Sequence, residues 1–527
     1  MIGTTMLLSV LATSASGLSI PGSNDRNLES RQVADELTCP FTIYTAHANV
    51  SHEPYSTGKY HLGYQRPPPS CRTWNSTQIE DNIEEMRSVI KDPDLFRIFE
   101  NSFPNTLDTT VRWKGTAEGS DEELSFIITG DIDAMWIRDS AAQLHSYLPF
   151  VIPSDEPDSF ASLFRGAINL QARYLLQFPY CNAFQPPPES GLAPANNTEQ
   201  NKDTIVTPTP DDNLTWQCKY ELDSVGSFFQ LSTDYYSKTG DFEFFGKYQW
   251  VKAVEAMMQL VDEQLYPTYQ ANGSINIAPY TFQALTFRAT ETFSNNAYGN
   301  PVNGGTGLVR SGFRPSDDAC IYELFIPANM QLAYTLETTV EIVEKLGGMD
   351  DLVERMKTRA SLIRGGIEQH AIINGMYAFE VDGYGGLAMM DDAGVPSLLS
   401  APFLGYVDRT DPVYQKTRKW ILSEQNPYWM RGPVLNAVGS PHIGPGWSWP
   451  MGTIMQIITS DDDAEIVDAL GQLVASTDGL GLMHESIFAS NQSSYTRPWF
   501  AWVNGLFGEM ILDLNERKPE ILQTSFQ

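Results

Sequence analysis

The segment GDIDAMWIRDSAAQLHSYLP, residues 130–149, mixes charged side chains with large apolar ones. Four charged residues and a tryptophan stand out in it: Asp131, Asp133, Arg138, Asp139 and Trp136. Burying a charged side chain is costly unless it has a partner, so such a mixture is typical of a functional site. In residues 140–147, small and apolar side chains recur at the spacing expected for a helix that packs against other helices. The charges are therefore expected where a loop becomes a helix N-terminus, which favours acidic residues and oxygen-rich ligands.

Two other interpretations of this segment stay open. Asp131 and Asp133 could cap the helix, with Arg138 and Asp139 forming a buried ion pair. The Asp-x-Asp spacing also fits a calcium loop, although the segment lacks the glycine and the closing glutamate of an EF-hand.

Helical periodicity recurs along the chain and indicates a mainly α fold. The expected helices are 78–92, 139–149, 160–178, 222–238, 242–265, 319–346, 350–369, 411–422, 451–459, 462–476 and 499–514. Strand patterns are short, and 109–113 and 124–128 are expected to pair as a hairpin. Helices in series, joined by long loops, are typical of a helical toroid or solenoid.

Composition excludes several classes of protein. Aromatic residues make up 11% of the 527 residues and charged residues only 19%, which indicates a globular chain and not a disordered one. The formal net charge is −31, and no run of lysine or arginine occurs. Binding to nucleic acid or to an anionic membrane through bulk electrostatics is therefore not expected.

The N-terminal region has the pattern of a protein destined for secretion. An apolar run at 6–12, followed by small residues, predicts a signal peptide over 1–20 and is too short to span a bilayer. Glycosylation sequons begin at Asn49, Asn75, Asn196, Asn213, Asn272 and Asn491. These features predict a soluble, secreted, N-glycosylated protein.

The five cysteines predict two disulfides and one thiol. Cys39 and Cys71, and likewise Cys181 and Cys218, bracket loop-like stretches that a crosslink would tether. Cys320 lies in an apolar run and is expected to be a buried thiol. No Cys-x-x-Cys or His/Cys cluster suggests zinc, so no metal site is predicted.

The mature chain is predicted to have one main domain. An N-terminal arm is expected over 21–75, before a catalytic domain over 76–527. Within that domain, 182–212 is rich in proline and asparagine and is predicted to be a surface insertion.

The candidate catalytic residues are acidic residues in loops. Asp317 and Asp318 follow Arg314 just before the helix expected from 319. Glu485 lies next to His484 in the segment 481–486. Two further candidates, Asp223 and Trp449, come from the segments 220–224 and 444–450.

Glycoside hydrolysis needs such a set of residues. One carboxylic acid protonates the leaving oxygen while a second carboxylate acts as base or nucleophile, and aromatic faces pack on the sugar ring. Simpler interpretations remain: Asp317 and Asp318 could cap the expected helix with Ser316 as N-cap, and Glu485 could belong to an internal ion pair.

Several of these motifs, in order, resemble the family 125 glycoside hydrolases. The matching stretches are 103–111, 130–143, 221–224, 311–319, 391–406, 483–486 and 497–509. The resemblance implies an (α/α)6 toroid, similar to glucoamylase, with short β-hairpins in its loops. It also implies an exo-acting α-1,6-mannosidase that inverts configuration without a metal or other cofactor.

The resemblance also implies roles for individual residues. Glu485 would be the general base, and Asp317 or Asp318 the general acid. Trp136, Arg138 and Asp139 would form the wall of the −1 subsite, where the terminal sugar binds. Further substrate-binding residues near this subsite would be Asp131, Asp133, Asp223, Arg314, His484 and Trp449.

Two other functions remain open at this point. One is a different exo-glycosidase on the same toroid, because one fold hosts many specificities. The other is a glycan-binding protein without catalysis. In each case the expected partner is a mannose-containing oligosaccharide or a related glycan, with neither nucleic acid nor membrane, and the chain is expected to be a monomer.

Overall fold

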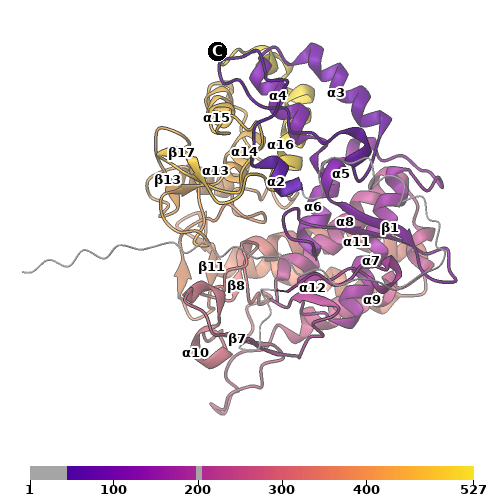
Figure 1. Ribbon diagram of the computed structural model, residues 1–527. Coiled ribbons are helices and arrows are strands. Elements are labelled where there is room, and N and C mark those ends of the chain that lie inside the picture. The colour runs from indigo at the N-terminus through magenta and orange to yellow at the C-terminus, as the bar shows by residue number, and fades with distance from the viewer. Residues whose placement is uncertain (1–43, 198–203) are drawn as a thin grey trace, which may run out of the picture.

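Helices arranged in a ring dominate the computed structural model, which describes residues 44–197 and 204–527 (Figure 1). Five of them form an inner group, in which α6 contacts α8 and α16, α8 contacts α11, and α14 contacts α16. The inner helices are α6 (Ile137–His145), α8 (Leu222–Thr239), α11 (Ile326–Leu346), α14 (Pro450–Ile458) and α16 (Ala501–Arg517).

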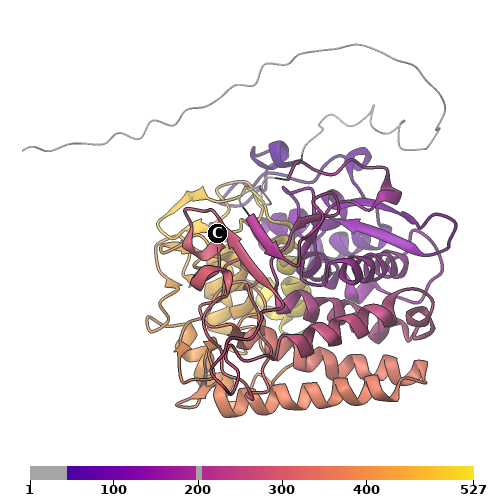
Figure 2. The same cartoon turned by 90° about the horizontal axis from the view of Figure 1, so that it is seen from below.

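Outer helices alternate with the inner ones along the chain. They are α4 (Pro93–Ser102), α7 (Phe160–Gln177), α9 (Trp250–Glu263), α12 (Asp350–His370), α13 (Pro412–Ile421) and α15 (Asp463–Ala475). The longest two helices, α11 and α12, lie side by side and appear in coral tones in Figure 2. Between α12 and α13, residues 397–406 form mostly buried turns in place of a sixth inner helix. The predicted mainly α, (α/α)6 fold is confirmed.

Further helices and small sheets precede the ring or form the loops between its helices. The further helices are α2 (Tyr44–Ala48) and α3 (Thr77–Val89), which come before α4, and α5 (Asn105–Thr109) and α10 (Ser294–Ala297). Turns of 3₁₀-helix are η1 (Pro69–Cys71), η2 (Leu148–Phe150), η3 (Pro188–Ser190), η4 (Glu243–Gly246), η5 (Ala289–Glu291) and η6 (Pro519–Gln523).

All the paired strands are antiparallel. The two-stranded sheets are β1 (Val111–Thr116) with β2 (Glu123–Ile127), β5 (Thr204–Thr207) with β7 (Thr281–Ala284), β9 (Ile372–Ile373) with β10 (Met376–Tyr377), and β13 (Trp429–Met430) with β14 (Ala437–Val438). The three-stranded sheets are β3 (Met135–Trp136), β4 (Ala183–Phe184) and β6 (Thr215–Gln217); β8 (Leu324–Phe325), β11 (Glu380–Val381) and β12 (Leu387–Ala388); and β15 (Trp447–Ser448), β16 (Ile487–Phe488) and β17 (Asn491–Tyr495). The β1–β2 pair is the predicted hairpin.

Among the described helices, α4, α7, α13 and α15 begin with a capping side chain. The Ser159 side chain accepts a hydrogen bond from the Ser162 N–H at the start of α7, and Asp462 accepts from Ala464 and Glu465 at the start of α15. Such caps satisfy backbone N–H groups that have no partner inside the helix. Asp92 caps α4, with Pro93 in the first turn. Helix α4 is not among the helices predicted from periodicity, although this capping signal is present in the sequence.

Two predicted helices begin several residues later than expected. The helix expected from residue 319 begins at Ile326, because β8 occupies Leu324–Phe325 and pairs with β11. The prediction that Asp317 and Asp318 lie at a helix N-terminus is therefore wrong. The helix expected over 242–265 is divided into η4 and α9, which begins at Trp250.

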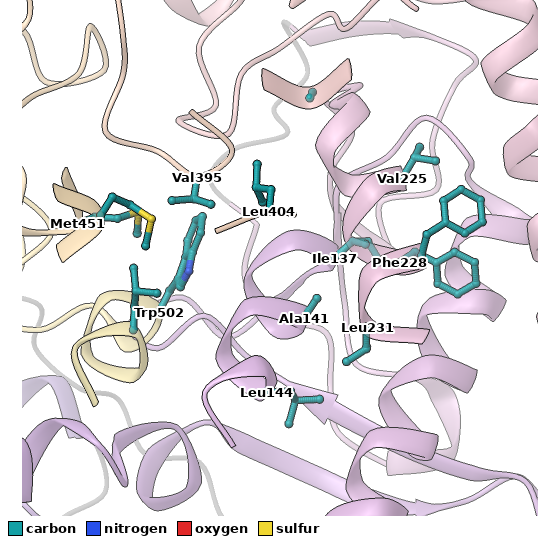
Figure 3. Packing of buried hydrophobic residues seen from close by; sticks show 14 of the residues in the cluster. Ile137, Ala141, Leu144, Val225, Phe228, Leu231, Val395, Leu404, Met451 and Trp502 are labelled. Carbon is teal, nitrogen blue, oxygen red and sulfur yellow. The ribbon is translucent and has the colours of Figure 1, made fainter. Parts of the chain in front are cut away.

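Part of the core between the inner helices is apolar. Figure 3 shows α6 beside α8 with the buried side chains of Ile137, Ala141, Leu144, Val225, Phe228 and Leu231. Across from them, Trp502 of α16 lies among Val395, Leu404 and Met451. The ring is thus filled from both the helices and the turns at 397–406.

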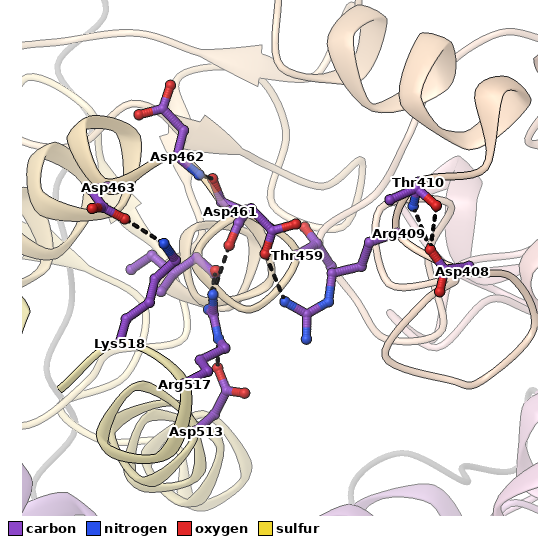
Figure 4. A network of polar contacts seen from close by, with 12 residues as sticks. Asp408, Arg409, Thr410, Thr459, Asp461, Asp462, Asp463, Asp513, Arg517 and Lys518 are labelled. Carbon is purple, nitrogen blue, oxygen red and sulfur yellow. Dashed lines mark hydrogen bonds and ion pairs between the residues drawn. The ribbon is translucent and has the colours of Figure 1, made fainter.

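Polar contacts join the C-terminal end of α16 to neighbouring helices of the ring (Figure 4). Arg517, at the end of α16, donates hydrogen bonds to the carbonyls of Ile457 at 2.8 Å and Ser460 at 2.7 Å. Lys518 pairs with Asp463 at the start of α15. These contacts tie the last inner helix to α14 and to the capped start of α15.

The cysteines follow the prediction where the structure describes them. Cys181 and Cys218 form a disulfide, and Cys320 is free and buried. The predicted partner of Cys71, Cys39, lies outside the described residues. The Cys181–Cys218 bond brackets the segment 182–212, which was predicted as a surface insertion. Residues 182–187 of that segment are buried, and exposure begins at Pro188.

The N-terminal arm packs on the helical domain where the structure describes it. Arg66 is buried and pairs with Asp108 at 2.8 Å and with Glu80 at 2.6 Å. Across the two described ranges, none of the helices combines the length and apolarity that crossing a bilayer would require.

Two adjacent glycines of α12 offer a matched test of packing. A Cβ at Gly366 would lie 2.3 Å from the Thr306 carbonyl oxygen, whereas a Cβ at Gly365 would meet nothing within 4 Å. We expect Gly366→Ala to lower the free energy of unfolding by about 1–3 kcal/mol through overpacking. Gly365→Ala should raise it by up to about 1 kcal/mol through helix propensity. Urea unfolding measures both, and shifts of the same sign would contradict the described packing.

A cavity of about 470 Å³ opens at the end of the ring where α6 terminates. There His145 Nδ1 lies 2.9 Å from Glu509 Oε1, and His145 Nε2 lies 3.8 Å from Asp234 Oδ2. Burial alone would lower the pKa of His145, but Glu509 and Asp234 raise it to about 10. His145 is therefore a cation at neutral pH.

This ion cluster predicts a pH-dependent stability. A pKa raised on folding contributes stability below the unfolded value of about 6.5, and that contribution is lost as the pH rises towards 10. Relative to His145→Gln, we expect the wild type to be more stable by about 1.5–3 kcal/mol at pH 6, as for a hydrogen bond to a charged group. The difference should shrink by pH 10 in urea unfolding, and a pH-independent difference would contradict the assigned charge.

Candidate active site

The first residues of three inner helices meet at a cavity of about 510 Å³. Its lining includes four tryptophan or phenylalanine rings and six polar or charged side chains: Trp136, Trp449, Phe500, Trp502, Arg138, Asp139, Asp317, His442, Glu485 and Arg497. Trp136, Trp449 and Phe500 directly precede α6, α14 and α16. The positive ends of three helix dipoles therefore face the carboxylates of the cavity.

Arg138 forms the centre of a buried charge network. Its guanidinium lies 2.6 Å from Glu221, 3.2 Å from Asp223, 3.2 Å from Asp139 and 3.8 Å from Asp317. Burial raises the pKa of Asp139 to about 6 and that of Asp223 to about 6, against the opposing charge of Arg138. One cation thus faces four acids, so the predicted Arg138–Asp139 ion pair is part of a larger cluster.

Asp317 faces the cavity in an unusual backbone conformation. Its φ is +65°, in the left-handed region that residues other than glycine seldom adopt. Lys219 Nζ donates to the Asp317 carbonyl oxygen at 2.9 Å, and the Asp317 N–H donates to the Arg314 carbonyl at 2.9 Å. The surrounding contacts hold this conformation, as expected for strain at a functional site.

Asp318 does not line the cavity. Its side chain is 1% exposed, compared with 26% for Asp317. Asp318 Oδ2 accepts a hydrogen bond from Ser316 at 3.2 Å and lies 3.5 Å from His442 Nδ1. Burial alone would lower the pKa of His442, but Asp318 raises it. Of the two candidates left open by the sequence, Asp317 is the one that a substrate can reach.

Glu485 is held on the cavity lining by two neighbours. Thr496 Oγ1 donates to Glu485 Oε2 at 2.9 Å, and Arg497 Nε lies 3.5 Å from the same oxygen. Arg497 also pairs with Asp131 at 3.0 Å, so Asp131 acts on the site through this arginine. The carboxylate of Glu485 is fixed in orientation and remains accessible from the cavity.

Other predicted site residues lie outside the cavity lining. Asp133 is half exposed and pairs with Arg112 at 3.3 Å. Arg314 is buried and pairs with Glu380 at 2.6 Å. Asp223 lies behind Arg138, with no exposed side-chain surface.

His484 is also outside the lining. Its Nδ1 lies 2.9 Å from the Arg497 carbonyl, and its ring stacks on Tyr495 with centroids 4.0 Å apart. Burial lowers the pKa of His484 to about 4, so the ring is neutral and supports the backbone at Arg497.

Sequence reasoning missed several residues of the site. Arg497, Phe500 and Trp502 lie within the family-like stretch 497–509, but no role was assigned to them. His442 comes from a loop that carried no signal. Glu221 lies in the segment 220–224, from which only Asp223 was predicted as a site residue, and its side chain is completely buried against Arg138.

The arrangement is suited to acid–base chemistry on a sugar. Two carboxyls, Asp317 and Glu485, line one cavity with aromatic rings that can pack on a pyranose. Over residues 44–197 and 204–527, no group of three histidine, cysteine, aspartate or glutamate side chains is placed to hold a metal ion.

Comparison with known proteins identifies the family. Residues 92–512 match the sequence profile of the family described as metal-independent alpha-mannosidase (GH125). The chain is 47% identical over 500 residues to the meiotically up-regulated gene 157 protein of Schizosaccharomyces pombe, covering 93% of this chain and 96% of that protein.

A solved structure agrees with this assignment. It is a Streptococcus pneumoniae protein from a study of metal-independent alpha mannosidases and N-linked glycan processing, in a non-productive complex with alpha-1,6-mannobiose. The TM-score is 0.72 at 32% sequence identity, over 85% of this chain and 100% of that one. This chain belongs to family 125 of the glycoside hydrolases, the metal-independent α-mannosidases.

Proposed function

We propose that the protein is an exo-acting α-1,6-mannosidase that removes non-reducing terminal mannose from N-glycans or mannans with inversion of configuration. The observation that carries this proposal is the shared cavity, on which Asp317 and Glu485 lie together with Trp136, Trp449 and Trp502.

In this proposal the two carboxyls have separate roles. Asp317 protonates the glycosidic oxygen, and Glu485 takes a proton from the water that attacks the anomeric carbon. Arg497 and Thr496 orient Glu485 for that water. The aromatic rings pack on the apolar face of the mannose, while Arg138 and Asp139 lie where they can bind its hydroxyls.

The linkage proposal is supported by the mannobiose named for the Streptococcus pneumoniae protein. It is tested by incubating purified protein with α-1,2-, α-1,3- and α-1,6-mannobiose and measuring released mannose chromatographically. We expect release from the α-1,6 isomer at least tenfold faster than from the others, a difference of about 1.4 kcal/mol in transition-state binding. Faster release from another isomer would reassign the linkage, and no release from any would reject the enzymatic proposal.

We also propose that the protein is exported and N-glycosylated. All six sequon asparagines are exposed, which an acceptor site requires, and the Cys181–Cys218 bond suits an oxidising compartment. Removing N-glycans enzymatically from protein collected in the medium of expressing cells should lower its mass. An unchanged mass, or retention of the protein inside the cells, would contradict this proposal.

A further inference from the structure

The segment 442–449 borders the catalytic cavity at both of its ends. His442 and Trp449 line the cavity, and their ring centroids lie 6.4 Å apart with the ring planes at 78°. Nδ1 of His442 is buried and lies 3.5 Å from Asp318 Oδ2, which holds the first end of the segment in place. The segment therefore leaves the cavity wall at His442 and returns to it at Trp449.

Within this segment, Trp447 lies one strand repeat away from Trp449. The chain is extended here, because Trp447 and Ser448 form β15 and Trp449 has φ −109° and ψ 120°. In an extended chain every second side chain points to the same face, and two residues span about 6.6 Å. Ser448, between the two tryptophans, is buried and donates to the Leu435 carbonyl at 2.7 Å. Trp447 is thus on the same face of the strand as Trp449, further from α14.

Phe488 joins Trp447 from the strand that follows Glu485. Strand β16 pairs with β15 so that Phe488 lies opposite Trp447, with ring centroids 5.6 Å apart at 64°. The Phe488 ring packs on Gly446, where a Cβ would lie only 2.8 Å from a ring carbon. The two paired strands therefore continue from Trp449 and Glu485, which line the cavity, to this aromatic pair beside it.

Exposure increases from the cavity wall to the aromatic pair. Trp449 is 4% exposed, Trp447 is partly buried, and Phe488 is 38% exposed. Among residues 44–197 and 204–527, the main apolar core and the side chains packed against it include Trp449 but neither Trp447 nor Phe488. Large apolar rings that remain at the surface beside a ligand cavity are typical of a binding surface.

We propose that Trp447 and Phe488 form the +1 subsite, which binds the sugar that leaves. This inference rests on the proposed function, because an exo-acting mannosidase holds the terminal mannose beside its two carboxyls and the next sugar outside them. Aromatic rings offer an apolar surface to the C–H face of a pyranose. The pair would therefore bind the second mannose of an α-1,6-linked chain as it extends from the cavity towards the surface.

Two substrates separate binding of the leaving sugar from the chemistry at the carboxyls. α-1,6-Mannobiose places a sugar in the +1 subsite, whereas α-mannosyl fluoride releases only fluoride. We expect the ratio of kcat/KM for mannobiose to kcat/KM for the fluoride to fall about tenfold or more in Trp447→Ala. In Phe488→Ala it should fall about three- to tenfold. Trp447→Phe, which keeps an aromatic ring, should recover most of the wild-type ratio.

Tyr55→Ala is the matched control for removal of an exposed ring. Tyr55 is 45% exposed in the N-terminal arm, and the next residue, Ser56, donates a hydrogen bond to Asp94 of the outer helix α4. Its substitution should leave the substrate ratio within about twofold of the wild type.

A purely structural role for the aromatic pair gives a different result. Opposed aromatic residues also stabilise an antiparallel sheet, so their loss could lower the melting temperature without affecting recognition. Trp447→Ala and Phe488→Ala proteins that melt earlier but keep the wild-type substrate ratio would overturn the inference.

Phe488→Ala keeps the inference testable if Trp447→Ala does not fold, because Phe488 is the more exposed of the two rings. An unchanged ratio in Phe488→Ala, with a wild type that hydrolyses both substrates, would overturn the +1 subsite alone. A wild type that hydrolyses neither mannobiose nor the fluoride would instead overturn the proposed function on which the inference rests.

Discussion

Glu485→Gln is expected to lower kcat/KM for α-1,6-mannobiose by about 10²–10⁴-fold, because an amide cannot take a proton from the attacking water. The substitution keeps the size of the side chain, and the amide oxygen can still accept from Thr496, which lies 2.9 Å from Glu485. Steady-state kinetics measure the loss, and titration calorimetry with mannobiose should show that binding persists.

Asp133→Asn is the control for this result. The sequence suggested Asp133 as a substrate-binding residue, but it lies outside the cavity, half exposed, beside Arg112. We expect its kcat/KM to stay within about twofold of the wild type, as for surface substitutions away from special features. Unchanged hydrolysis in Glu485→Gln would remove Glu485 from the role of base.

Asp317→Asn should separate the two candidate acids. It removes the carboxyl that faces the cavity, so kcat/KM for mannobiose should fall by about 10²–10⁴-fold. Hydrolysis of 2,4-dinitrophenyl α-mannoside, which needs no proton on its leaving group, should be largely retained. The measurement is the ratio of kcat/KM for the two substrates.

Asp318→Asn is the matched comparison. Asp318 is 1% exposed and holds Ser316 and His442 in place, so its loss should lower activity on both substrates together and also lower the melting temperature. If Asp318→Asn rather than Asp317→Asn spared only the activated substrate, the acid would be Asp318 instead.

Local periodicity was enough to predict most of the helical ring. The helix expected over 160–178 is α7, Phe160–Gln177, and that over 350–369 is α12, Asp350–His370. The helix from 319 was placed too early because apolar residues continue through Phe325, where pairing with β11 gives a strand instead. That pairing involves residues far away in sequence, which periodicity does not report.

The site was predictable in composition but not in geometry. The sequence placed Asp317 and Asp318 together and could not choose between them. Their difference comes from Lys219, 98 residues away, which holds the Asp317 carbonyl, and from His442, which lies beside Asp318. Arg314 was also predicted to bind substrate, but it forms a buried ion pair with Glu380, which lies 66 residues further along the chain.

The most direct test of the two-carboxyl account is proton NMR of the wild-type protein acting on α-1,6-mannobiose, recording which anomer of mannose appears first. Acid Asp317 and base Glu485 acting through a water predict β-mannose first, followed by slow conversion to the α anomer. Early α-mannose would mean retention through a covalent intermediate, and it would contradict the assignment of Glu485 as a base.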